Sequence, residues 1–389
     1  MTHNVPRFEG DAAGSFVLRL AVALQQEGHA VDIIAPGEAG LPANSVLEGV
    51  CIDRVRYGTD ANMMLAYRGT MAESVRGSWR GKFALVGLLR ALRSATRAHL
   101  DAATREGQPY HVVHAHWWFP AALALWRFRR PSDPPMAITM HGSDVRLAAT
   151  LAPAQKLMRA VLRAASVRTA VSSWLADTAS RIAPDLRIHV EPMPVDTRHF
   201  AAAPPVNGST RAGVLFVGRL NAQKGIAVLL EIMAEPALRA AVLDVVGDGP
   251  DAHALQTRAA ALGIAHRVRW HGTLPQPELV PLYQCAAVVA MPSTDEGLGL
   301  VAVEAQLCET PVVAFASGGL PDVVRMDAGG TLVTPGDTRA FATSLARLLD
   351  DPSLARRCGV RARDAMLSHF APTEVAARYV KRYREAIDM

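Results

Sequence analysis

Cysteine is scarce in this sequence of 389 residues, which has four, far apart from one another: Cys51, Cys285, Cys308 and Cys358. This spacing excludes a disulfide-stabilised small domain and a paired-cysteine metal site, and it is typical of reduced thiols in a cytosolic protein. No apolar run approaches the roughly 20 residues that a membrane-spanning helix needs. Residues 1–12 contain Arg7, Glu9 and Asp11 and no apolar core, so we expect no secretory signal.

Acidic residues are fewer than basic ones in the first half of the chain. Residues 1–200 contain 23 Lys and Arg against 17 Asp and Glu, whereas the rest contains 18 against 19, so the formal charge of +5 belongs to the first half. Nucleic acid is one explanation, but the sequence lacks the interleaved aromatic and basic residues of RNA-binding proteins. An anionic membrane surface or an anionic acceptor explains the excess equally well, and we expect no nucleic-acid partner.

Short apolar runs alternate with helical patterns along almost the whole chain. A length of 389 residues suggests two domains, because single cores stop growing near roughly 250–300 residues. The alternation predicts right-handed βαβ units, and hence an α/β protein of two doubly wound, Rossmann-like domains. Strands are predicted at Ala30–Ala35, Val50–Tyr57, His111–His116, Ala137–His141, Val167–Val171 and Arg187–Val190, with helices starting near Gly14, Ser78, Pro120, Pro153 and Ser172.

The alternation is interrupted at residues 191–213, which are rich in proline, alanine and small polar residues, and we interpret this segment as a linker. It predicts an N-terminal domain at 1–195, joined by a C-terminal helix at 373–389, and a C-terminal domain at 196–372. Ligands of open α/β sheets bind at the carboxyl ends of the strands, so we expect a ligand site in the cleft between these domains. Strands of the second domain are predicted at Val214–Gly218, Val242–Val246, Val268–His271, Ala287–Met291, Pro311–Ala314 and Thr331–Val333, and its last helical stretches at Asp337–Leu349, Ser353–Phe370 and Thr373–Ile387.

The start of the first domain departs from this pattern. A loop and the helix from Gly14 are present, but only Met1-Thr2-His3 stands where an apolar first strand is expected. We therefore hypothesise that the first strand is missing from this sequence. An apolar stretch in frame upstream would support the hypothesis, and its absence would contradict it.

The segment from Ser293 to Gly319 predicts an anion-binding site. A strand ends at Pro292, an acidic loop follows, and a helix starts near Gly299. The first N–H groups of a helix lack intrahelical partners, and a glycine there allows a phosphate to approach them. Glu296 and Glu304 could then hold hydroxyl groups of a nucleotide sugar; the alternative is an ordinary strand–loop–helix with two solvated glutamates.

Two cations flank the turn after the first strand of the second domain. Arg219 and Lys224 could both reach a diphosphate at the carboxyl end of that strand. A basic helix cap is the alternative. The next strand is followed by Gly247-Asp-Gly-Pro, for which we favour a purely structural role.

Taken in order, these motifs resemble the retaining glycosyltransferases of family 4, which have the GT-B fold. The resemblance rests on Gly218-Arg-Leu with Lys224-Gly225, on Gly247-Asp-Gly-Pro, on Gly272, on Glu296 and Glu304, and on Gly318-Gly-Leu-Pro-Asp322. Weaker matches cover the first half. The sequence departs from the family pattern at Leu298, where an aromatic is usual, at Glu309, where glycine is usual, and at Ala13-Gly14, where a glycine pair is usual.

The resemblance implies a role for each matching residue. Arg219 and Lys224 would hold the donor diphosphate and stabilise the leaving group, Glu304 would bind the ribose, and Glu296 would bind the donor sugar. His141 would lie near the donor sugar. Further donor contacts are implied for Gly14, Gly218, Gly272, Gly299, Leu300 and Val301.

Histidines and tryptophans mark the first-half side of the predicted site. His114 and His116 alternate along one predicted strand, and we expect them on opposite faces of it. Trp117 and Trp118 follow at the strand end, where exposed indoles with His116 would form the acceptor side; packing under the next helix is the alternative. His141 ends another strand, and with the motif we favour a catalytic role for it beside Glu296, Arg219 and Lys224.

Residues 76–105 form a basic amphipathic stretch with one acid, Asp101. Such a helix could lie on an anionic membrane; a core-facing helix with a solvated basic face explains the basic stretch equally well.

We predict a retaining transferase that moves a sugar from a nucleoside-diphosphate sugar to a hydroxyl of a carbohydrate or lipid-linked acceptor. No metal or other cofactor is expected, and we expect a cytoplasmic protein, peripheral on the inner face of the membrane if residues 76–105 bind lipid. The alternatives are a GT-B nucleotide-sugar 2-epimerase and an inactive homologue that acts as a binding partner.

Overall fold

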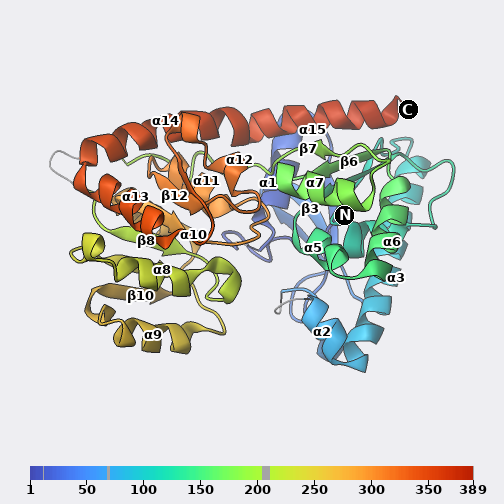
Figure 1. The fold of residues 1–389 in the computed structure, drawn as a ribbon. Helices are drawn as coiled ribbons and strands as arrows, with labels where there is room; N and C mark the ends of the chain where they lie inside the picture. The colour runs from blue at the N-terminus through green and yellow to red at the C-terminus, as the bar shows by residue number, and fades with distance from the viewer. Residues whose placement is uncertain (12, 68–70, 204–210, 389) are drawn as a thin grey trace. The chain divides into compact units, whose positions relative to one another are not determined.

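The computed structural model describes residues 1–11, 13–67, 71–203 and 211–388, in two compact units (Figure 1). Unit 1 comprises Met1–Pro194 and Pro372–Met389, and unit 2 comprises Val195–Ala371. Residues 204–210 of the predicted linker lie outside the described part. None of the helices in the described ranges combines the length and the apolar composition that are needed to cross a lipid bilayer.

The described part of unit 2 contains a six-stranded sheet in the order β10-β9-β8-β11-β12-β13, and all of its strand pairs are parallel. Its central strands are continuous apolar runs because helices cover both faces of a doubly wound sheet. The strands are β8 (Val214–Val217), β9 (Leu243–Val246), β10 (Val268–Gly272), β11 (Val288–Met291), β12 (Val312–Phe315) and β13 (Thr331–Val333). The helices are α8 (Ile226–Met233), α9 (Ala252–Ala261), α10 (Gln276–Cys285), α11 (Leu300–Leu307), α12 (Leu320–Val323), α13 (Thr338–Asp350) and α14 (Pro352–Phe370).

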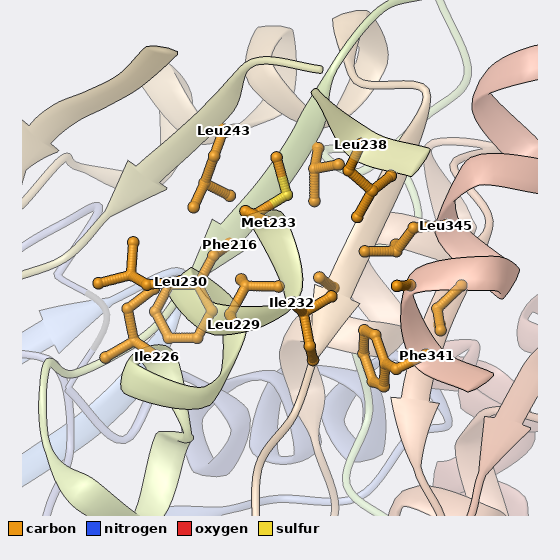
Figure 2. Packing of buried hydrophobic residues seen from close by; sticks show 14 of the residues in the cluster. Phe216, Ile226, Leu229, Leu230, Ile232, Met233, Leu238, Leu243, Phe341 and Leu345 are labelled. Atoms are coloured by element: carbon orange, nitrogen blue, oxygen red, sulfur yellow. The ribbon is translucent and has the colours of Figure 1, made fainter. Parts of the chain in front are cut away.

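Helix α8 supplies much of the core of unit 2. Figure 2 shows its apolar side chains between Phe216 of β8, Leu243 of β9 and Phe341 of α13. The buried residues of α8 are all Ile, Leu or Met. This packing fixes the turn between β8 and α8, which carries two of the predicted site residues.

The described part of unit 1 contains a parallel sheet in the order β4-β5-β6-β7 and a three-stranded sheet in the order β1-β3-β2. The strands are β1 (Asp32–Pro36), β2 (Asn44–Leu47), β3 (Val50–Val55), β4 (Val113–His116), β5 (Met136–Met140), β6 (Val167–Ala170) and β7 (His189–Val190). The helices are α1 (Ser15–Gln26), α2 (Met71–Gly77), α3 (Trp79–Arg105), α4 (Leu123–Leu125), α5 (Ser143–Ala149), α6 (Ala152–Arg163), α7 (Ser173–Ile182) and α15 (Pro372–Ile387).

The first two residues connect these two sheets. The Met1 amino group donates to the His114 carbonyl at 2.7 Å, and the His116 N–H donates to the Met1 carbonyl at 2.9 Å. On the other side the Thr2 N–H donates to the Ile34 carbonyl of β1 at 3.0 Å. Met1 and Thr2 therefore lie between β4 and β1, where the central strand of a doubly wound sheet belongs.

Both predicted parallel sheets are confirmed, and the differences are local. Strand β2 pairs antiparallel with β3 and was not predicted, because its sequence Asn-Ser-Val-Leu has only two apolar residues. Helices α2 and α5 were also not predicted, since each has only 7 residues. The helix expected to start near Pro120 is short: the chain forms one turn at 118–122 and the three-residue α4.

Helix α15 packs against the sheet of unit 1 through a buried carboxylate. Glu191 follows β7, and its side chain is 3% exposed. Its Oε1 accepts from Arg382 Nε at 2.8 Å, and its Oε2 lies 3.3 Å from Arg378 Nε. The ion pairs hold the last helix on unit 1, where Tyr379 and Tyr383 reach β4 and β5.

Glu191→Ala should destabilise unit 1 by about 3 kcal/mol, because it removes the buried carboxylate that faces two half-buried guanidinium groups, although Arg382 keeps Glu385 as a second partner. Asp185 is a matched control, since it also pairs with two arginines, Arg159 and Arg163, but at the surface. Asp185→Ala should change stability little. Urea unfolding of the two variants measures both effects, and equal midpoint shifts would contradict the account.

Candidate functional site

The sheet of unit 2 reverses its strand order between β8 and β11. Strands β9 and β10 continue from β8 on one side, and β12 and β13 continue from β11 on the other. The loops after β8 and β11 therefore diverge at a topological switch point, which is where open α/β sheets bind ligands. Arg219 and Lys224 follow β8, and Glu296 follows β11, so all three predicted residues flank this point.

An ion pair joins the two loops. Lys224 Nζ lies 2.7 Å from Glu296 Oε2, and the two side chains are 21% and 14% exposed. Asn221 caps the turn before Lys224 by accepting from its N–H at 3.2 Å. The Thr294 N–H donates to the Gln223 carbonyl at 2.9 Å, so backbone and side-chain contacts together fix the position of the Lys224 ammonium beside the acidic loop.

Glycines allow these loops to approach each other closely. Gly225 has φ +69°, and a Cβ there would lie 2.1 Å from the Pro292 carbonyl oxygen. Gly318 has φ +59°, and a Cβ there would lie 2.3 Å from the Glu296 carbonyl oxygen. The Gly319 N–H donates to that same carbonyl at 2.7 Å. The acidic loop is therefore held between the turn after β8 and the turn after β12.

Helix α11 begins directly after the acidic loop. Its N-cap Gly299 has φ +92° and ψ +55°, a left-handed conformation that favours glycine. No side chain caps this end in the described structure. The first N–H groups of α11, which include those of Leu300 and Val301, have no acceptor within the helix and could bind an anion.

Glu304 lies one turn into α11, and one of its carboxylate oxygens already has a partner. Tyr283 Oη, from α10, donates to Glu304 Oε2 at 2.9 Å. Burial, and then the Glu304 charge, raises the pKa of Tyr283 well above 10, so the phenol stays protonated and acts as the donor. The pairing fixes the orientation of the Glu304 carboxylate.

Arg219 is exposed, and within the described residues its side chain has no hydrogen bond or ion pair. It is therefore the cation at the switch point that no carboxylate holds. Gly218, before it, packs its backbone against Gly247, where a Cβ would lie 1.9 Å from the Gly218 carbonyl oxygen. Gly272 ends β10, and its carbonyl accepts from the Gly247 N–H at 2.7 Å. The structural role predicted for Gly247 agrees with this close packing.

In unit 1, His141 follows β5 inside an aromatic cluster. Its ring centroid lies 4.2 Å from that of Trp117, 5.1 Å from that of Phe16 and 5.2 Å from that of His116. Its Nε2 lies 3.1 Å from His116 Nδ1, so one of the two rings donates to the other. Burial lowers the pKa of His141 well below 6.5, and the imidazole is neutral at pH 7.

The expectation that His114 and His116 lie on opposite faces of the strand is wrong. Their ring centroids are 4.1 Å apart, because residues two positions apart in a strand share a face. His114 Nδ1 lies 2.8 Å from Tyr383 Oη of α15, and its Nε2 lies 2.7 Å from Thr139 Oγ1. Burial lowers the pKa of His114 to about 3, so this ring is also neutral and serves as a packed, hydrogen-bonded support for His116.

The expectation of exposed indoles is also wrong. Trp117 and Trp118 are 5% and 1% exposed, in agreement with the alternative of aromatic packing. Trp118 Nε1 donates to the Asp144 carbonyl at 2.8 Å, and the Trp118 N–H donates to Asp144 Oδ2 at 3.1 Å. Asp144 Oδ1 accepts from the N–H groups of His141 and Gly142, so this buried carboxylate shapes the loop that carries His141.

Gly14 lies at the start of α1 with φ +66°, and a Cβ there would lie 2.5 Å from the Asn4 carbonyl oxygen. The loop of residues 4–11 therefore folds back on the helix start at this glycine.

Two supporting residues were not predicted. Asp144 could have been found from its place three residues after His141 at a strand end. Tyr283 could not, because it is 21 residues from Glu304 and its contact depends on the packing of α10 against α11. Among the described residues, no group of three or more His, Cys, Asp or Glu side chains is placed to hold a metal ion.

Gly225→Ala should destabilise unit 2 more than Gly263→Ala. Both glycines have φ near +70°, but a Cβ at Gly263 meets nothing within 4 Å, whereas one at Gly225 meets the Pro292 carbonyl. Gly263→Ala should cost about 1 kcal/mol from the left-handed backbone alone, and Gly225→Ala at least about 1 kcal/mol more. Chemical denaturation compares the two, and equal losses would show that the loops relax without cost.

Stability should fall as the pH falls below about 6.5, because four buried or partly buried histidines of unit 1 have lowered pKa values. Burial lowers the pKa of His3 to about 4 and that of His114 to about 3, and lowers those of His116 and His141 well below 6.5. The unfolded chain therefore binds protons that the folded chain does not, at roughly 1 kcal/mol per histidine for each pH unit below 6.5. Thermal unfolding at pH 7.5 and 5.5 measures the effect, and His116→Gln should flatten it. Equal melting temperatures at the two pH values would contradict the lowered pKa values of these histidines.

Comparison with known proteins supports the architecture of both units. The model of "Glycosyltransferase Family 4" matches residues 13–199, and the model of "Glycosyl transferases group 1" matches residues 201–365. The D-inositol 3-phosphate glycosyltransferase of Xylanimonas cellulosilytica is 32% identical over 97% of this chain and 93% of its own. The enzyme of that name from Mycobacterium avium is 30% identical over 97% of this chain and 90% of its own.

Solved structures share the fold. Sucrose-phosphate synthase from Thermosynechococcus elongatus superposes with a TM-score of 0.77 at 22% identity, covering 96% of this chain and 92% of that one. Anabaena HepE in complex with UDP and glucose has a TM-score of 0.66 at 17% identity, covering 96% of each chain. With the two parallel sheets and the loops at the β8–β11 switch point, these matches show that the chain is a GT-B glycosyltransferase and belongs to glycosyltransferase family 4.

Proposed function

We propose that the enzyme transfers a sugar from a nucleoside-diphosphate sugar to a hydroxyl acceptor with retention of the anomeric configuration. The observation that carries the proposal is the Lys224–Glu296 ion pair, at 2.7 Å, on the loops that flank the β8–β11 switch point. Arg219 and the start of α11 lie on the same two connections, so two cations and free N–H groups are available to a diphosphate.

In the proposed reaction the bond between the anomeric carbon and the diphosphate oxygen breaks as the acceptor oxygen attacks from the same face. The acceptor proton passes to the leaving diphosphate oxygen. Arg219, Lys224 and the N–H groups of Leu300 and Val301 stabilise the charge that develops on the diphosphate. These groups neutralise it without a metal ion, so we propose that turnover persists in the presence of a chelator.

Glu296 acts on the sugar by orientation in this proposal, not as a covalent nucleophile. One of its carboxylate oxygens is engaged by the Lys224 ammonium, which lowers its nucleophilicity, and the other can accept from a sugar hydroxyl. Glu304, oriented by Tyr283, takes the ribose hydroxyls. His141, a neutral ring that hydrogen-bonds through Nε2 to His116, takes a hydroxyl of the donor sugar.

The acceptor is proposed to be a carbohydrate or a lipid-linked sugar, used in cell-surface polysaccharide or glycolipid synthesis by a cytoplasmic enzyme. A second candidate acceptor is D-inositol 3-phosphate, because relatives about 30% identical along nearly the whole chain carry that name. UDP-sugars are the first donors to test, since Anabaena HepE was solved with UDP-glucose.

The proposal is tested by turnover of a nucleotide-sugar panel with and without each acceptor. Thermal shift selects the donor, and proton NMR of the product gives its anomeric configuration. Acceptor-dependent release of the nucleoside diphosphate with a retained anomer supports the proposal. Inversion, acceptor-independent epimerisation or the absence of turnover with every donor contradicts it.

Lys224→Ala should lower turnover at least about 100-fold, the usual scale for removing one preorganised charge that stabilises a leaving group. Lys156→Ala, which removes an exposed lysine of α6 in unit 1, is the control and should leave turnover unchanged. Steady-state kinetics with saturating donor measures both. Wild-type turnover in Lys224→Ala would reject the leaving-group role.

Glu296→Gln should have opposite effects on binding and on turnover. Removing the carboxylate frees the Lys224 ammonium, so the nucleoside diphosphate should bind several-fold more tightly. Turnover should nevertheless fall, because the amide no longer holds Lys224 and the sugar in the same geometry. Calorimetric titration with UDP and steady-state kinetics measure the two changes; weaker UDP binding would show that Glu296 is not what restrains Lys224.

A further inference from the structure

Helix α3 presents apolar side chains to solvent on the face where a surface helix normally carries polar residues. Its inner face is buried through Ala84, Leu88 and Leu92. On the outer face Trp79 is 73% exposed, Phe83 is 74% exposed and Val86 is 46% exposed.

Two arginines follow these apolar residues on the same side of the helix. Trp79, Phe83, Val86, Arg90 and Arg93 are spaced four, three, four and three residues apart, which keeps them on one side of a helix. We call this set the α3 stripe. Lys82 lies at its edge, with Nζ 4.3 Å from the Trp79 ring centroid, and the Arg93 guanidinium lies 3.9 Å from the ring centroid of Phe128, itself 56% exposed.

The stripe is held rigidly on unit 1. Ser78 caps the helix by accepting from the Gly81 N–H at 3.0 Å. A Cβ at Gly81 would lie 2.0 Å from the Ser74 carbonyl oxygen, and one at Gly87 would lie 2.3 Å from the Tyr57 carbonyl oxygen. Figure 1 shows α2 beside the N-terminal turns of α3. The exposed aromatics therefore stand on a closely packed helix.

The segment of α3 that carries the stripe has charged residues of one sign. No acid occurs from Trp79 to Arg97, and Arg97 itself is bound to Asp133 at 2.6 Å. Lys82, Arg90 and Arg93 remain beside the apolar residues. The predicted stretch began at Arg76, whose side chain lies outside the described part.

We propose that the α3 stripe docks unit 1 on an anionic phospholipid bilayer. Trp79, Phe83 and Val86 would enter the boundary between head groups and acyl chains, and Lys82, Arg90 and Arg93 would contact lipid phosphates. A second copy of the chain is the alternative occupant of this surface, and the experiment below distinguishes it from a bilayer. Docking does not depend on the proposed sugar transfer, so flotation tests the first and turnover tests the second.

The test is flotation of the full-length enzyme with vesicles of phosphatidylcholine alone or mixed with phosphatidylglycerol. The wild type should float with the anionic vesicles only. The double variants Trp79→Ser/Phe83→Ser and Lys82→Glu/Arg90→Glu should each lower the partition coefficient at least about tenfold. The matched controls, Met326→Ser/Val360→Ser and Arg339→Glu/Arg347→Glu, change exposed residues of unit 2 and should float like the wild type.

Thermal unfolding confirms that each variant is folded, which the exposure of the changed side chains favours. Equal recovery of the wild type from both kinds of vesicle would overturn the proposal. So would wild-type flotation of Trp79→Ser/Phe83→Ser. Sedimentation that shows a wild-type dimer, lost in this variant without a change in flotation, would assign the stripe to a second copy and would also overturn it.

Discussion

The ion pair between Lys224 and Glu296 joins the two loops on which the candidate site of unit 2 is built. A partly buried ammonium and carboxylate 2.7 Å apart restrain each other's orientation before any ligand arrives. The pair also sets the charge of the site. Glu296 offsets the charge of Lys224, whereas no carboxylate of the described residues offsets that of Arg219. In the reaction proposed above, the restrained Lys224 cation stabilises the charge that develops on the leaving group.

The geometry of this pair depends on backbone more than on side chains. Gly225, Gly247 and Gly318 each allow a carbonyl oxygen to come where a Cβ would otherwise lie. The apolar α8, packed between β8, β9 and α13, fixes the turn from which Lys224 extends (Figure 2). In unit 1, the position of His141 is fixed by the aromatic and imidazole rings that surround it. Neutral histidines that hydrogen-bond to one another and to Thr139 and Tyr383 can be enclosed there without an uncompensated charge.

The sequence predicted the parallel strands well because each is a short apolar run between helical patterns, as in Val288–Met291. It did not predict β2, whose few apolar residues resemble a loop. It indicated the residues at the switch point through their spacing. It did not reveal that Lys224 and Glu296 bind each other, because they are 72 positions apart and each could have faced a ligand instead.

In unit 1 the wrong predictions concern β4 and the two residues that follow it. His114 and His116 share a face, and their neighbours Trp117 and Trp118 turn inward because Asp144 and the rings around His141 receive them. At Glu309, where the family usually has glycine, the chain keeps the left-handed backbone, with φ +58°, at a cost on the order of 1 kcal/mol. Glu309 therefore takes up the left-handed backbone that the end of α11 requires, although it is not a glycine.

The most direct test of the central claim is a crystal structure of the enzyme with a bound nucleoside diphosphate. The account predicts that the diphosphate lies at the β8–β11 switch point, within hydrogen-bond distance of the Arg219 and Lys224 side chains and of the first N–H groups of α11. A diphosphate that binds elsewhere, or that binds there without contacting either cation, would contradict it.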